Sequence, residues 1–171
     1  METCPRAEDT KPSFNVSIVY DERSAATRAM NVFTGLRRRF GDEFDFQCDL
    51  WRFDVLELPE TLAAALVAGE AADLIIISAH CDSGLPAGVR DWFEQCIAMK
   101  APGSAALVGL LEPPCRSVDV RCPTRRFLQN AADRSLMDFF LHEVDLPRTN
   151  PGLTNEEVQN IHPVRRWGIN E

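Results

Sequence analysis

The feature that most restricts the fold is a short apolar run in the middle of the chain, DLIIIS, from Asp73 to Ser78. Four consecutive aliphatic residues leave no polar face, so the segment is predicted to be a strand covered on both sides. Parallel sheets with helices on both faces bury strands in this way. A chain of 171 residues is long enough for one domain with a full core. The run therefore favours an α/β fold built on a parallel sheet.

Strands and helices alternate on either side of this run. Strands are predicted at residues 14–20, 44–53, 73–78, 105–111 and 136–144. Helices are predicted between them at residues 24–40, in the alanine-rich stretch after Pro59, and at residues 88–99 and 124–135. This alternation predicts a flavodoxin-like, three-layer α/β sandwich with a five-stranded parallel sheet in the order 2-1-3-4-5.

The predicted helix at residues 24–40 has recognisable end signals. Ser24 is a predicted N-cap. Arginines 37–39 fall in the last turn, where positive charge suits the helix dipole, and Gly41 is predicted to end the helix. The only basic run in the chain is therefore interpreted as a helix terminus and not as a nucleic-acid-binding patch.

Two tryptophans raise the question of a planar ligand. Trp51 and Trp92 could stack on one. Trp92 falls on the apolar stripe of its predicted helix, so packing in the core is the favoured interpretation.

Charge and hydropathy bear on location and partners. The net charge of −8 opposes binding to nucleic acid and to anionic membranes. No run approaches the roughly 20 apolar residues that span a bilayer, and no apolar leader begins the chain. We expect a cytoplasmic protein with a loose arm at residues 1–13, one domain at 14–145 and a tail at 146–171 that docks on that domain.

The chain has six cysteines, none of them in a two-residue metal or redox spacing. Several lie in apolar patterns, where a thiol behaves as a small hydrophobic group. We expect free thiols. The alternative is a bond between Cys115 and Cys122, which share a loop.

Open sheets of this order bind ligands at the carboxyl ends of the strands, beside the first and third strands. The turns at residues 20–24 and 79–84 would meet there. Six residues of these turns and of the next strand end carry chemically active groups: Asp21, Glu22, His80, Cys81, Asp82 and Glu112. Such a set could form a metal site or a His–Cys nucleophile pair. Turns are also polar for purely structural reasons, so we assign no metal ligand and no catalytic residue.

Three segments carry a family resemblance: Leu85-Pro86 before a predicted helix, CDLWRFDVLELPE at residues 48–60 and KAPGSAALVGLL at residues 100–111. In these segments the chain resembles the flavodoxin-like NAD(P)H-dependent FMN reductases. The resemblance implies FMN as cofactor, hydride transfer from NAD(P)H to a flavin, and a homodimer. It implies that Arg23 and Ser24 hold the FMN phosphate. The residues implied to face the flavin ring are His80, Cys81, Asp82, Ser83 and Gly84.

A second likeness is to response-regulator receiver domains. Asp21 and Glu22 resemble the acidic pair that binds Mg²⁺ in those domains. Their phosphoacceptor aspartate would end the third strand, where Ser78, Ala79 and His80 stand instead. The alternative function is therefore a non-catalytic receiver-like module that binds a protein partner.

Overall fold

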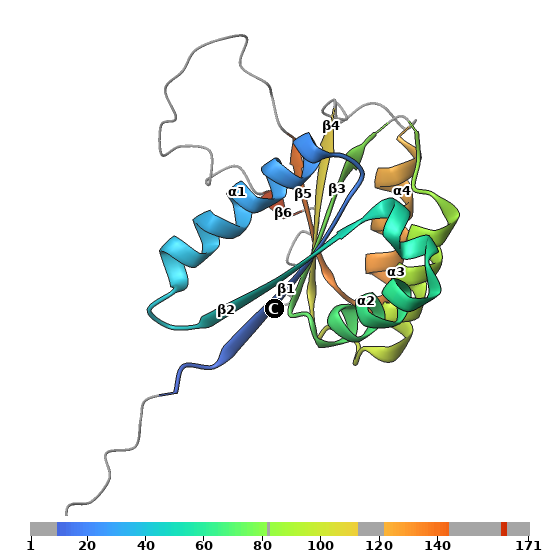
Figure 1. Ribbon diagram of the computed structural model, residues 1–171. Helices are drawn as coiled ribbons and strands as arrows, with labels where there is room; N and C mark the ends of the chain where they lie inside the picture. The colour runs from blue at the N-terminus through green and yellow to red at the C-terminus, as the bar shows by residue number, and fades with distance from the viewer. Residues whose placement is uncertain (1–9, 82, 113–121, 144–161, 164–171) are drawn as a thin grey trace, which may run out of the picture.

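The computed structural model describes residues 10–81, 83–112, 122–143 and 162–163. Its sheet has the predicted parallel order β2-β1-β3-β4-β5, and a short sixth strand pairs antiparallel with β5 at the edge (Figure 1). The strands are β1 (Ser13–Tyr20), β2 (Asp45–Arg52), β3 (Leu74–His80), β4 (Ala106–Glu112), β5 (Asp138–Glu143) and β6 (His162–Pro163). β6 is the part of the predicted tail that the structure describes.

The four predicted helices are present, and every predicted boundary lies within two residues of the observed one. They are α1 (Arg23–Phe40), α2 (Pro59–Ala71), α3 (Ala87–Met99) and α4 (Pro123–Ser135), and a 3₁₀ helix, η1 (Phe53–Glu57), precedes α2. α1 lies on one face of the sheet, and α2, α3 and α4 lie on the other (Figure 1). This follows from right-handed crossovers, because β2 and β3 flank β1 on opposite sides. None of the described helices is long and apolar enough to cross a membrane.

β3 is the centre of the core, as its apolar run predicts. All of its residues except His80 are buried. Leu74 and Ile76 pack in the cluster under α1, and Ile75 and Ile77 pack in the larger cluster under α2, α3 and α4. The continuous apolar run is therefore explained by helices on both faces.

The two tryptophans belong to the core on the α2–α4 side. Trp92 is fully buried, and Trp51 is partly buried against the same cluster. Packing, the favoured interpretation of Trp92, is confirmed.

The start of α1 differs from its prediction. Ser24 is not the N-cap, because the helix begins at Arg23 and the cap position belongs to Glu22. The Ser24 hydroxyl donates to the Glu22 carboxylate instead. The reason lies in the preceding turn, where Asp21 continues the pairing with β3 through Ser78 and its carboxylate accepts the Glu22 N–H. At the other end Gly41 caps the helix as predicted, with its N–H donating to Arg37 O at 2.9 Å.

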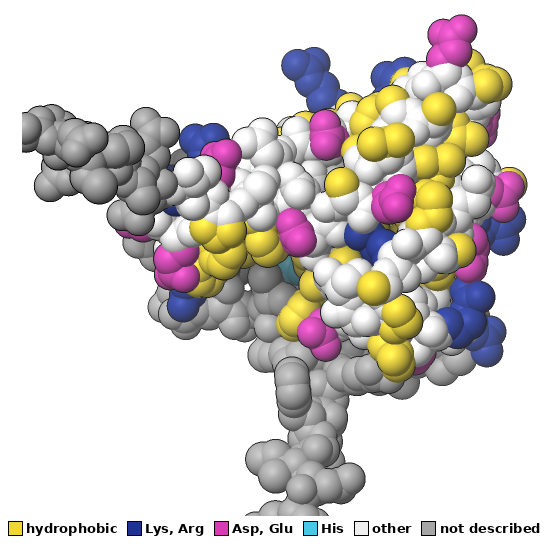
Figure 2. All heavy atoms as spheres, turned by 90° about the horizontal axis from the view of Figure 1, so that it is seen from below, with side chains coloured by type: hydrophobic (Ala, Val, Ile, Leu, Met, Phe, Trp, Pro, Cys, Tyr) yellow, Lys and Arg dark blue, Asp and Glu magenta, His cyan; other side chains and the backbone are white. Residues whose placement is uncertain are grey.

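Figure 2 shows the molecule from the end at which the strands begin. Hydrophobic side chains form several separate patches there, with acidic and basic side chains between and around them. The exposed large hydrophobic residues among those described are dispersed over different segments: Leu50, Leu58, Val67, Met99 and Leu136.

Candidate functional site

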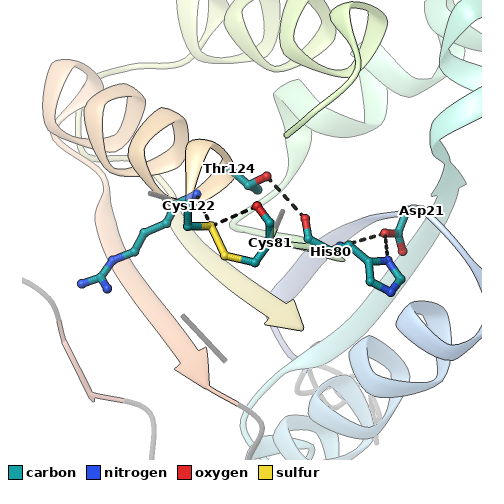
Figure 3. Close-up of a disulfide and its surroundings, with 6 residues drawn as sticks. Asp21, His80, Cys81, Cys122 and Thr124 are labelled. Carbon is teal, nitrogen blue, oxygen red and sulfur yellow. Dashed lines mark hydrogen bonds and ion pairs between the residues drawn. A yellow bond between two sulfur atoms is a disulfide. The ribbon is translucent and has the colours of Figure 1, made fainter. Parts of the chain in front are cut away.

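The candidate site lies where β1 and β3 end, the point at which the winding of the sheet reverses. Tyr20, the last residue of β1, pairs with Ser78 of β3, so Asp21 lies beside His80 at the end of β3. Figure 3 shows the Asp21 carboxylate beside the His80 ring. The two turns that the sequence placed at one crevice are thus adjacent.

Asp21 and His80 form a fixed pair. Asp21 Oδ2 accepts the His80 backbone N–H at 2.8 Å and lies 2.7 Å from His80 Nδ1. The other carboxylate oxygen of Asp21 accepts the Glu22 N–H at 2.7 Å. The Asp21 side chain is only 19% exposed, whereas that of His80 is 43% exposed. A largely buried carboxylate therefore orients an accessible imidazole.

The surroundings of His80 favour its charged form. The hydrogen bond that the His80 ring donates to Asp21 raises the pKa of His80, and burial opposes this effect. The charges of Asp21, Glu22 and Glu112 raise it further. Glu22 Oε1 lies 3.9 Å from Nε2, the ring nitrogen that does not face Asp21. The pair is thus built to stabilise a proton on the ring.

Glu112, at the end of β4, is the strand partner of His80, but its carboxylate faces Arg28 of α1. The two side chains form an ion pair in a mostly buried position. Arg28 Nε and Nη2 are buried and have no hydrogen-bond partner among the described residues. The ion pair with Arg28 therefore fixes the position of the Glu112 carboxylate, whose charge still contributes to raising the pKa of His80. The sequence did not single out Arg28, although its place on the apolar stripe of α1, next to Ala29, is an available signal.

The expectation of free thiols is wrong for two of the described cysteines. Cys81 and Cys122 form a disulfide, with Cα atoms 5.5 Å apart (Figure 3). The end of β3 and the start of α4 are adjacent only in the fold, and the two residues are 41 positions apart, so spacing could not reveal the bond. The alternative partner, Cys115, lies outside the described residues.

Cys48 and Cys96 are free, as predicted. Burial is the main cause that raises the pKa of Cys48 to about 11 and the pKa of Cys96 to about 12. Both remain protonated at neutral pH and act as small hydrophobic groups.

The loop after β3 packs toward α4. Gly84 has φ 68°, a conformation that favours glycine, and a Cβ placed there would lie 3.6 Å from Pro123 Cγ. Ser83 is exposed. Asp82, one of the predicted ring-facing residues, lies outside the described residues. The disulfide and the contact with Pro123 join this loop to the start of α4.

The residues present do not fit FMN well. Arg23 and Ser24 begin α1, where the phosphate would bind, but the carboxylates of Asp21 and Glu22 come directly before them. The Ser24 hydroxyl is occupied by Glu22. On the ring side, Cys81 is bonded to Cys122. We therefore assign no reaction step to a flavin.

A hollow of about 480 Å³ opens beside the Asp21 turn. Its lining combines the ends of β1 and β2 with η1 and the start of α3: Asp21, Glu22, Arg23, Arg52, Phe53, Asp54, Glu57 and Pro86. Arg52 is already paired with Asp54, with Nε and Oδ1 2.6 Å apart. The carboxylates outnumber the guanidinium groups, so the hollow favours a ligand with positive charge. His80 is not among the described residues that line this hollow; it adjoins the hollow through its partner Asp21. A second hollow, of about 500 Å³, lies on α4 and is lined by neither Asp21 nor His80.

No group of three His, Cys, Asp or Glu side chains in the described part of the chain is placed to hold a metal ion. The candidate site therefore rests on the Asp21–His80 pair and the neighbouring hollow.

The fold and the site define a parallel α/β domain with a histidine–aspartate pair at the carboxyl ends of β1 and β3. No protein-family model and no curated protein matches the sequence. Among solved structures, the chain is similar to one described as the crystal structure of TesA, with 15% sequence identity and a TM-score of 0.43 over 73% of this chain and 77% of that one.

The resemblance to FMN reductases leads to a direct test. We expect the purified protein to be colourless and to leave the fluorescence of micromolar FMN unchanged, because Asp21 and Glu22 repel the phosphate. Fluorescence titration measures this, and the Glu22→Gln variant reports the contribution of one carboxylate. A yellow protein, or saturable quenching at micromolar FMN, would show that the crevice accepts the cofactor.

Proposed function

We propose that the crevice is an acid–base site in which His80 exchanges a proton with a small bound molecule. The observation that carries the proposal is the double contact of Asp21 Oδ2, which holds both the backbone and the ring of His80. A surface histidine without this carboxylate would be free to rotate. Here the ring has one orientation, which is what proton transfer in a site requires.

The direction of proton transfer follows from the pairing. An ionised carboxylate only accepts hydrogen bonds, so Nδ1 of His80 carries the proton that faces Asp21. In the neutral ring, Nε2 then has the free electron pair and is the base. When Nε2 takes a proton, Asp21 stabilises the resulting imidazolium. The same group can return that proton to the product.

The hollow indicates the ligand class. Its acidic lining favours a small polar molecule that carries an amine or another cationic group. As a probe we choose putrescine, a linear diamine. We expect millimolar putrescine to shift the NMR signals of Asp21, Glu22 and His80, and we expect the Glu57→Gln variant to weaken this response. If those signals do not move at any concentration, the assigned ligand class is wrong.

Catalysis is tested with p-nitrophenyl acetate, an activated ester that imidazole hydrolyses. We expect His80→Gln to lower the protein-catalysed rate by about 10²-fold, the lower end of the range for general base catalysis. The matched control is His142→Gln, because His142 lies on β5 outside the crevice. If both variants hydrolyse the ester like the wild type, His80 is not an acid–base group, and the receiver-like protein-binding function becomes the account to test.

A further inference from the structure

We propose that Cys81 and Cys122 form a thiol–disulfide exchange site in which Cys122 is the attacking thiolate. The pair lies next to the acid–base site, because Cys81 follows His80 directly, but the proposal does not depend on the function of His80. It assigns a redox activity toward low-molecular-weight thiols and disulfides.

The position of Cys122 in the fold favours its ionised form. It is the N-cap residue of α4, and its sulfur accepts the Arg125 backbone N–H at 3.4 Å. A helix N-terminus offers unpaired N–H groups and a positive dipole end, and both stabilise a negative sulfur. Serine, threonine, aspartate and asparagine are the usual caps. The start of α4 therefore stabilises the thiolate form of Cys122 relative to its thiol form.

The charge of the first turn of α4 also favours a thiolate at Cys122. Helices usually carry acidic residues there, because these suit the dipole. This turn contains no acidic residue and carries Arg125 and Arg126 instead. Two guanidinium groups at a positive helix end are unfavourable for the helix itself. They are favourable when the cap residue carries a negative charge.

The groups on the neighbouring strands are consistent with this environment. His80 ends β3, and its carbonyl oxygen is 3.5 Å from the Thr124 hydroxyl of α4. On β4, the backbone oxygen of Glu112 accepts the Cys81 N–H at 2.9 Å. The Glu112 carboxylate is paired with Arg28, which reduces the effect of its negative charge on the two thiols. Figure 3 shows Cys81, Cys122, Thr124 and His80 in this arrangement.

The exchange reaction balances without further cofactors when a small disulfide, of the glutathione disulfide class, is the oxidant. The Cys122 thiolate attacks one sulfur of that disulfide, forms a mixed disulfide and releases one thiolate. The Cys81 thiol then loses its proton and attacks Cys122 Sγ, which releases the second small thiol and closes the Cys81–Cys122 bond. The protein gives up two electrons and two protons, and the small disulfide becomes two thiols. Excess small thiol runs the same steps in reverse.

The burial of Cys81 and Cys122 decides which measurement can report their ionisation. Cys81 is 4% exposed and Cys122 is 5% exposed. Alkylation rates would therefore report access as well as ionisation. The absorbance of the thiolate at 240 nm does not depend on access, so it is the better readout.

The experiment uses the full chain with C4S and C115S, which remove the two cysteines outside the described residues. The absorbance at 240 nm is followed against pH in the reduced C81S variant and in a variant that carries both C81S and C122S. The difference between the two curves gives the ionisation of Cys122 alone. We expect a midpoint near pH 7. At neutral pH Cys122 would then be present as thiolate to an extent at least tenfold greater than an ordinary thiol of pKa about 8.5.

R126E is expected to move the midpoint upward, because it replaces a positive charge near Cys122 with a negative one. R38E, at the far end of α1, is the matched control and should leave the midpoint unchanged. A midpoint at or above 8.5 overturns the proposal.

A second measurement keeps the proposal testable if C81S fails to fold. The C4S/C115S protein is equilibrated with mixtures of glutathione and glutathione disulfide, quenched with acid and mapped by mass spectrometry. We expect one reversible transition confined to Cys81 and Cys122, with Cys48 and Cys96 unmodified throughout. If no such bond forms, or if it persists in every mixture, the pair is not an exchange site.

Discussion

Replacing Trp92 with alanine is expected to lower the free energy of unfolding by about 3–5 kcal/mol. Trp92 is 0% exposed and packs in the cluster under α2, α3 and α4. A Cβ placed on Gly69 of α2 would lie 3.0 Å from its ring, so α2 is in close contact with the indole. Alanine would therefore leave a cavity that the surrounding helices can fill only in part. Urea unfolding measures the loss.

The matched control for this variant is Val67→Ala, which also shortens an apolar side chain. Val67 lies on the same helix as Gly69 but is 69% exposed. Its truncation should change stability by less than about 0.5 kcal/mol. If W92A costs no more than V67A, the indole does not fill the core, and its place on the buried stripe of α3 would need another explanation.

The Asp21→Asn substitution is expected to lower the free energy of unfolding by about 1–2 kcal/mol at pH 6. The variant keeps the shape of the side chain but loses the negative charge that accepts two backbone N–H groups and faces His80 Nδ1. Asp54→Asn is the control, because Asp54 is exposed and its ion pair is with the neighbouring, also exposed Arg52. It should leave stability unchanged. Equal losses in the two variants would mean that the Asp21 contacts contribute nothing specific.

The same substitution has a definite pH dependence. Because the folded protein raises the pKa of His80, the stabilising effect is fully present below the unfolded pKa of about 6.5 and is lost as the pH rises through the folded value. The stability difference between wild type and D21N should therefore shrink from pH 6 upward, until His80 is neutral in both. Urea unfolding at several pH values measures this. A difference that grows with pH has the wrong sign for the account.

The architecture could be predicted because its signals are local. The apolar run at residues 74–77 predicts a strand buried on both faces, and the alternation around it predicts the strand order. Helix ends are less certain, as Ser24 shows: its hydroxyl bonds to a side chain in the preceding turn, and the helix starts one residue earlier.

For the site, the sequence predicts which turns lie near each other but not which side chains are in contact. Strand order places Asp21 and His80 at one edge, but their contact joins residues 59 positions apart. The Arg28–Glu112 pair spans 84 positions. Such pairings depend on strand register and on the rotation of α1 over the sheet, and neither is encoded in a short motif. The disulfide has the same origin, since it depends on the loop after β3 meeting the start of α4.

An NMR titration of the His80 ring in the wild type and in D21N would show whether Asp21 controls the protonation of this histidine. The account predicts a His80 pKa above its ordinary value of about 6.5 in the wild type, together with a tautomer that carries its proton on Nδ1. In D21N the pKa should fall and the tautomer preference should weaken. If His80 titrates at the same pH in both proteins, Asp21 does not control it, and the crevice has no acid–base pair.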